Sequence, residues 1–492
     1  MKKHSTVKVV LITILVIILL SWILPAAYFQ NSYIDQGRIQ MGIFDLFSYP
    51  ATAISYFGYI ALYILVVGGF YGVLNKIGAY RKLLDGIANT FKKRGKLTIS
   101  ITMILLAVLT SICGIQLAIL LFVPFIVSII LLMGYNKIVA ALTVVGSTMI
   151  GIAGTTYAYN NVSIITTTLG VKIDSNLLFK VLILVFGLAL LIFNTIRYIN
   201  SIDKKVVSKK TTTKKTTKKS DTNKASKTQE VKTVQSSDIK DFVPEESKTK
   251  SSVVPLVVVL SIMCIIMILS FISWTGAFKL DAFENAKKAV VEFKVFGFAL
   301  FGKILGNVNA FGSWTLTDLI PMIVLFTGLL MIIYKVKFNE GLEAFAAGAK
   351  RAIQPAVLVV LIYTCLVAAT YHPFQLVIYK FLFGFTKGFN VITSLLAGIL
   401  SSTLNADPLY SFQSVLPYLA SLVSSKGTLS DISVVYPAVY GMTMLVAPTS
   451  VVLMAVLSYL GISYKEWFKN IWKLLLELLI LLLIIFIILV LV

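Results

Sequence analysis

Apolar runs of about 20 residues recur along this chain between residues 8 and 492, and they decide what it can fold into. An α-helix of about 20 apolar residues is long enough to cross roughly 30 Å of hydrocarbon. Only 13% of the residues are charged and 58% are hydrophobic, a balance far outside the range of soluble proteins. The sequence therefore predicts an all-α polytopic membrane protein that is embedded in the lipid bilayer.

The formal net charge of +23 comes from basic residues that lie between the apolar runs. Such residues mark cytoplasmic loops, so this charge does not predict a nucleic-acid partner. Lys2, Lys3 and Lys8 place the N-terminus in the cytoplasm of a plasma-membrane protein. The first apolar run is longer than the core of a signal peptide usually is, so we expect a retained helix. Counting crossings from there places the C-terminus outside.

About nine transmembrane helices are expected, together with two re-entrant hairpins that enter and leave the membrane on one side. The first membrane half, 1–199, contains a hairpin at 97–133 open to the cytoplasm. The second half, 253–492, contains a hairpin at 390–424 open to the outside. Between the halves, 200–252 has 14 lysines against seven acids and is predicted to be a disordered cytoplasmic linker. The nine helices are expected near 8–29, 52–75, 138–170, 175–198, 253–276, 316–336, 353–372, 432–460 and 470–492.

The two halves repeat one pattern. "GSTMIGIAGT" (146–155) resembles "GMTMLVAPTS" (441–450), and Thr110 and Pro124 lie 293 residues before Thr403 and Pro417. Each half reads helix, surface stretch, hairpin, interrupted helix, helix, and the halves enter from opposite sides, which predicts an inverted-topology repeat. In transporters built this way, substrate and ions bind near the bilayer midplane, where hairpin tips and interrupted helices meet.

Candidate substrate and ion ligands are the polar and helix-breaking residues at the two tips and the two interruptions. Pro448 removes a backbone donor and is expected to leave carbonyls free, while Asp407 is a carboxylate expected deep in the membrane. Asp407 is suited to bind a coupling cation, to exchange a proton or to pair with a cationic substrate. Ordinary membrane helices also contain proline kinks, so the argument rests on the matched positions. The full set is Ser111, Gly114, Gln116, Gly154, Thr155, Thr156, Asn160, Asn161, Ser402, Thr403, Asn405, Asp407, Ala447, Pro448, Thr449 and Ser450.

These residues favour an ion-coupled secondary transporter of a small polar metabolite, an amino acid or a carboxylate, that works by alternating access. We expect no cofactor and no metal site, because the two histidines and three cysteines are isolated; the coupling ion would be Na⁺ or a proton. No phosphate-binding loop motif occurs, which disfavours a primary pump. The alternatives are a polytopic membrane enzyme, such as a lipid-linked transferase, or a channel. Symport and antiport stay equally open.

Several phrases resemble one known family. "SWILPAAYF" (21–29), "GGFYGVLNKIGAY" (68–80), "LAILLFVPFIVSIILLMGYNKIVA" (117–140) and "APTSVVLMAVLSYLGISYKEWFK" (447–469) look like the YfcC family, which is related to the anaerobic C4-dicarboxylate carriers of the ion transporter superfamily. The resemblance implies nine helices with two opposed hairpins, a homodimer, and secondary transport of small organic ions. It places ligands at tips 111–116 and 402–407 and at breaks 154–161 and 447–450. Gly114, Ile115 and Gln116 stand where the family tends to carry acids, so a basic amino-acid substrate is not implied.

Overall fold

The predicted all-α polytopic membrane fold is confirmed. The computed structural model describes residues 5–216, 241–245, 251–306, 308–386, 389–423 and 425–492. In these ranges eight helices are long and apolar enough to cross a membrane, and the strands β1 (Ala26–Gln30) and β2 (Ser32–Gly37) pair as a small antiparallel hairpin. Residues 24–29 were predicted as the end of the first helix. Residues 24 and 25 instead leave the helix and 26–29 belong to β1, because Pro25 disfavours the helical conformation of the residue before it.

The described part of the first half runs from α1 to α9. Its helix α9 continues to Thr216, into the range predicted as linker, whereas residues 217–240 and 246–250 lie outside the described residues. The elements are α1 (Ser5–Ile23), α2 (Ile43–Lys76), α3 (Gly78–Phe91), η1 (Lys92–Arg94), α4 (Gly95–Cys113), η2 (Ala118–Leu121), α5 (Val123–Leu132), α6 (Lys137–Ala141), the π-helical turn η3 (Leu142–Gly146), α7 (Ser147–Ala153), α8 (Tyr159–Leu169) and α9 (Leu177–Thr216).

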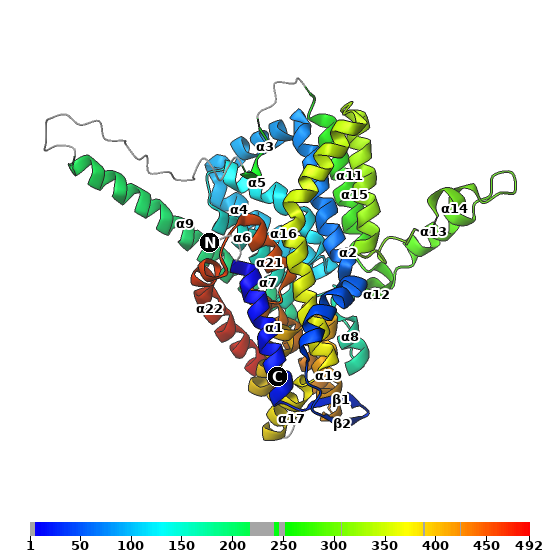
Figure 1. Ribbon diagram of the computed structural model, residues 1–492, viewed down its shortest axis with the longest axis vertical. Helices are drawn as coiled ribbons and strands as arrows, with labels where there is room; N and C mark the ends of the chain where they lie inside the picture. The colour runs from blue at the N-terminus through cyan, green and yellow to red at the C-terminus, as the bar shows by residue number, and fades with distance from the viewer. Residues whose placement is uncertain (1–4, 217–240, 246–250, 307, 387–388, 424) are drawn as a thin grey trace.

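The second half contains a short arm, α12–α14, that projects sideways from the bundle (Figure 1). The elements are α11 (Val254–Phe271), α12 (Trp274–Phe278), α13 (Ala282–Glu292), α14 (Leu300–Leu305), α15 (Leu316–Ile333), α16 (Phe338–Tyr371), α17 (Gln375–Thr386), α18 (Val391–Leu404), α19 (Pro408–Ser421), α20 (Lys426–Met444), α21 (Val451–Leu460) and α22 (Tyr464–Leu491).

Seven of the nine predicted helices are single long helices. The other two, 138–170 and 432–460, each consist of helical pieces on either side of a non-helical break, at 154–158 and at 445–450. The eighth long span, Gly78–Cys113, joins α3 to α4. In Figure 1, α4 and α5 lie toward the same end of the molecule as α3, and α19, which packs on α18, lies toward the opposite end with α17 and the β-hairpin. The two hairpins therefore lie toward opposite ends of the molecule.

The helices α2 and α16 run side by side through the molecule, and we call the pair the wall (Figure 1). Small residues make the contact, with Gly68 and Gly72 on α2 facing Ala344, Gly348 and Ala352 on α16. A Cβ at Gly72 would lie 2.1 Å from the carbonyl oxygen of Ala344. Small residues four apart let two membrane helices approach with their backbones in contact, so the wall is a tightly joined pair.

Candidate functional site

The first tip and the first break are joined by hydrogen bonds. Helix α4 ends at Cys113, and Gly114 follows with a φ of 67°, a left-handed conformation that glycine adopts without strain. Ser111 Oγ donates to the carbonyl oxygen of Gly154 at 2.7 Å. The backbone nitrogen and the hydroxyl of Thr156 donate to the carbonyl oxygen of Ser111, at 3.0 and 3.2 Å. Ser111, Gly154 and Thr156, which were predicted from the sequence, therefore form one cluster.

The second half repeats this contact. Thr449 in the second break is fully buried, and its hydroxyl donates to the carbonyl oxygens of Thr403 at 2.8 Å and Ser402 at 3.4 Å. Thr156 and Thr449 are 293 residues apart, the spacing that also relates the two hairpins. In each half, a threonine of the break thus holds the last turn of the first hairpin helix. This shared contact supports the predicted repeat.

Tyr440 connects the two halves. Its hydroxyl donates to the carbonyl oxygen of Ala406 in the second tip at 3.2 Å, and the side chain of Gln116 in the first tip lies near the same hydroxyl. The next residue, Gly441, touches α7 so closely that a Cβ there would lie 2.4 Å from the backbone nitrogen of Ala153. The two tips and the two interrupted helices therefore meet in one region.

Asp407 faces the wall from the second tip. Its carboxylate caps α19 by accepting a hydrogen bond from the backbone nitrogen of Leu409 at 2.8 Å, and the residue is half-buried. Four tyrosines lie within electrostatic range of this carboxylate: Tyr59 of α2, Tyr363 of α16, Tyr410 of α19 and Tyr440 of α20. A carboxylate at such a position can hold a cation or a proton.

Some predicted residues lie differently from the expectation. The Thr155 hydroxyl donates to the carbonyl oxygen of Ile152 in the preceding helix α7, at 2.5 Å, and so does not join the tip. The backbones of Asn160 and Asn161 lie in the first turn of α8, but their side chains lie outside the described residues. Asn405 donates to the side chain of Gln375 at 3.1 Å.

The expectation that Pro448 leaves nearby carbonyls free is wrong for two of them. The carbonyl oxygen of Leu445 accepts a hydrogen bond from Trp467 Nε1 at 2.8 Å, and that of Val446 accepts one from the Tyr464 hydroxyl. Both aromatic residues lie in the first turn of α22, three positions apart on one face. Sequence reasoning missed their role, although the spacing of Tyr464 and Trp467 was visible.

Two buried hydroxyls, one in the second break and one just before it, have no hydrogen-bond partner among the described residues. These are Ser450 Oγ, at the start of α21, and Thr443 Oγ1, near the end of α20. The turn between them is closed by a hydrogen bond from the Ser450 nitrogen to the carbonyl oxygen of Ala447 at 3.1 Å. Buried polar groups nearly always find partners, so these two hydroxyls are candidates to contact a bound ion or solute.

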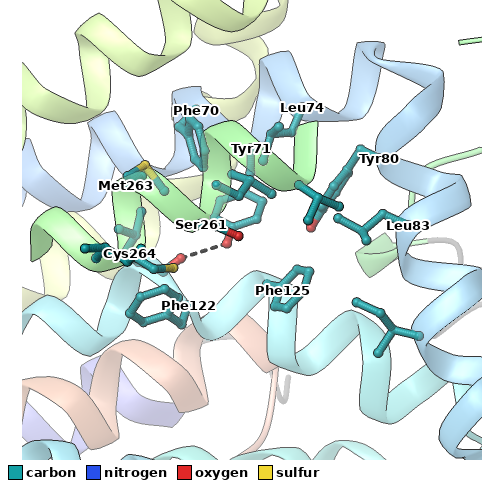
Figure 2. A pocket seen from close by; sticks show the side chains of 15 residues that line it. Phe70, Tyr71, Leu74, Tyr80, Leu83, Phe122, Phe125, Ser261, Met263 and Cys264 are labelled. Atoms are coloured by element: carbon teal, nitrogen blue, oxygen red, sulfur yellow. Dashed lines mark hydrogen bonds between the residues drawn. The ribbon is translucent and has the colours of Figure 1, made fainter. Parts of the chain in front are cut away.

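A separate cavity of about 440 Å³ lies away from the tips, between α2, α3, α5 and α11. Figure 2 shows its lining, in which Phe70, Phe122 and Phe125 are typical members. The hydroxyl of Tyr71 is directed to the carbonyl oxygen of Leu121 at 2.8 Å. An apolar lining of this kind suits a hydrocarbon chain and not a small polar solute, so this cavity is not the candidate site. In the described part of the chain, no group of three or more His, Cys, Asp or Glu residues is placed to hold a metal ion.

The fold and the meeting tips define the class of protein: an integral, multi-pass membrane carrier and not an enzyme. The chain belongs to the C4-dicarboxylate anaerobic carrier family (DcuC), whose family model matches residues 29–491. The match supports the broader relationship implied by the sequence resemblance. No curated protein and no solved structure matches the chain.

Proposed function

We propose that this protein is a cation-coupled secondary transporter of a C4-dicarboxylate or a similar small carboxylate, and that it works by alternating access. The observation that carries the proposal is the meeting of the two tips around Tyr440, with a matching threonine contact in each half. Two elements of opposite direction that converge on one place can expose it to either side of the membrane in turn. The family supports a carboxylate as the substrate.

Helix ends supply the attraction for a carboxylate. The helices α8, α19 and α21 begin at the first break, the second tip and the second break, respectively. A helix N-terminus carries partial positive charge and unpaired N–H groups, so it binds anions without a buried lysine or arginine. Asp407 already occupies the N-terminus of α19, which leaves α8 and α21 for the substrate.

The hydroxyls favour a cation beside the substrate. A hydroxyl has one proton, and those of Ser111, Thr156 and Thr449 are donated to backbone carbonyls. Their oxygen lone pairs stay available, and oxygen lone pairs are the ligands of hard cations. A sodium ion bound there would also reduce the repulsion between Asp407 and an anionic substrate. A proton on Asp407 would have the same electrostatic effect.

An amino acid is the second candidate substrate, and Asp407 favours it. The carboxylate of Asp407 faces the wall among tyrosine hydroxyls and could pair with an ammonium group. A dicarboxylate has no group for that role. The two candidates therefore differ in what Asp407 contacts.

The test is a set of melting curves of the purified protein with C4-dicarboxylates and amino acids, each with and without sodium and at two pH values. A ligand that binds only the native state raises the melting temperature. We expect a shift that requires a dicarboxylate together with sodium or low pH. A shift with an amino acid alone would favour the second candidate, and no shift with any combination, in folded protein, would count against both.

Orientation and assembly belong to the same proposal. We propose that the N-terminus and α3 face the cytoplasm, the C-terminus faces outward, and the working unit in the cell membrane is a homodimer. The basic residues of 76–96 support the orientation, since seven of them stand against Asp85 alone. Labelling of single cysteines in intact cells tests the orientation, and native mass spectrometry tests the dimer.

A further inference from the structure

A short piece of the linker is packed against the bundle. Residues 241–245, "DFVPE", contain the one aromatic residue and the one proline of 200–252. Val243 is only 5% exposed and Pro244 is buried, whereas Asp241 and Glu245 at the two ends are exposed. An otherwise polar linker has no reason of its own to bury an apolar triplet, so the surface that covers it is the informative feature. We call residues 241–245 the docked segment.

One side of the docked segment contacts the first hairpin and both interrupted helices. Ser128 Oγ of α5 donates to the carbonyl oxygen of Phe242 at 2.7 Å. The ring of Phe242 meets Tyr459 of α21 edge to face, with 5.2 Å between centroids. Lys137 Nζ lies 4.9 Å from the same ring centre, a cation–π contact. These three contacts come from elements that form the tips and breaks.

The other side contacts α3 and the wall. Arg81 Nη1 of α3 donates to the carbonyl oxygen of Pro244 at 2.6 Å. Beside the segment, a cavity of about 460 Å³ is lined by Lys76 of α2 and Arg351 of α16 as well as by Asp241 and Glu245. Basic residues on the wall thus share the cavity with the acidic ends of the segment, which is a favourable arrangement of charge.

The docked segment therefore bridges two groups of elements that alternating access must move relative to one another. We propose that the groove between the wall, α3 and α5 is a docking site for residues 241–245, and that the docked segment holds the first hairpin against the wall until it leaves. The holding role rests on the proposed function; the docking itself does not. The partner that this surface fits is an apolar triplet with an acidic residue at each end.

Docking is tested by thiol labelling of the full chain in which Cys113, Cys264 and Cys365 are replaced by alanine. Val243→Cys should react with a maleimide at least about tenfold more slowly than Val290→Cys, whose position on α13 is 45% exposed. Adding Phe242→Ala should remove most of that protection. With Phe242 intact, equal labelling rates of Val243→Cys and Val290→Cys would overturn the docking.

Ser128→Ala is the matched, milder variant. Its hydroxyl also lies 2.8 Å from the carbonyl oxygen of Pro124 in its own helix, and that backbone carbonyl stays bonded within α5 without it. The change therefore removes the contact with Phe242 without disturbing α5. We expect the labelling of Val243→Cys to rise about fivefold, the size of one neutral hydrogen bond. Unchanged labelling with both Ser128→Ala and Phe242→Ala would contradict the assigned contacts.

The holding role is tested without any substrate. Spin labels at Leu97→Cys on α4 and Glu343→Cys on α16, both exposed positions, report the separation of the first hairpin and the wall. We expect one narrow distance distribution in the parent and a second, longer component with Phe242→Ala. An unchanged distribution in a variant whose docked segment is released would overturn the holding role. Absence of transport by the parent protein would count against the proposed function and would leave both readouts intact.

Discussion

Replacing Gly72 by alanine tests whether backbone contact joins the wall. The new Cβ would lie 2.1 Å from the Ala344 carbonyl oxygen and 2.9 Å from Gly348 Cα. A carbon and an oxygen in contact are usually about 3.3 Å or more apart, so the two helices would have to separate by roughly 1 Å. Overpacking of a well-filled contact costs about 1–3 kcal/mol, and here the obstacle is backbone that cannot rotate away. We therefore expect Gly72→Ala to cost about 3 kcal/mol.

Two further glycines provide matched controls on helices of the same kind. The three atoms nearest to a Cβ at Gly69 would all belong to the ring of Phe345, a side chain that can move, so Gly69→Ala should cost about 1 kcal/mol. A Cβ at Gly328 of α15 would meet nothing within 4 Å, and alanine gains about 0.5–1 kcal/mol over glycine within a helix.

The assay is the melting temperature of each purified variant in one detergent and at one scan rate. We expect Gly72→Ala to melt several degrees below the parent, Gly69→Ala slightly below it, and Gly328→Ala at or above it. A melting temperature of Gly72→Ala equal to that of Gly328→Ala would refute the backbone contact between α2 and α16.

Three further predictions concern the tips and breaks. Thr449→Val leaves the Thr403 carbonyl without its donor and removes an oxygen ligand. The sodium concentration needed for half of the ligand-induced melting shift should therefore rise about tenfold, while Thr449→Ser should stay close to the parent. An unchanged sodium response would contradict the role assigned to Thr449. Asp407→Asn should abolish coupled uptake into proteoliposomes while the protein melts near the parent temperature, and normal uptake would exclude Asp407 from coupling. Tyr464→Phe removes the donor to the Val446 carbonyl and should lower the free energy of unfolding by about 1 kcal/mol, seen as a lower melting temperature. The control Tyr459→Phe leaves that hydrogen bond in place and should lower the melting temperature less. Equal losses in the two variants would argue against a specific support at Val446.

The helices could be predicted because hydrophobic length alone specifies them in a membrane. The geometry of the candidate site at the tips and breaks was harder to predict, because it depends on contacts between segments that are distant in the sequence. The sequence pairs Gly146 with Gly441 at a spacing of 295, which would align Thr156 with Val451. The structure instead pairs Thr156 with Thr449, because the stretch from Gly146 to Thr156 is two residues longer than the stretch from Gly441 to Thr449. A pattern match across two stretches of unequal length could not find this.

Tyr440 and the α22 aromatics show a second limit. Tyr440 lies in an apolar run, where a tyrosine usually only fills space, and nothing in its neighbours indicates that it binds the second tip and lies near the first. Trp467 is likewise one of several aromatic residues near a helix start. Their partners are backbone carbonyls, which carry no sequence signature.

The direction in which the Thr156 and Thr449 hydroxyls donate their protons affects uncoupled transport of the substrate. Because both protons are already donated to carbonyls, these two hydroxyls offer lone pairs and no donors to an approaching anion. Without the cation, the carboxylate would lack the positive charge that these lone pairs hold beside it, so uncoupled transport of substrate down its own gradient would be slower than coupled transport. A valine at either position would remove the lone pairs as well as the proton. The cation would then no longer bind before the substrate, and the transport of substrate and cation would be less tightly coupled.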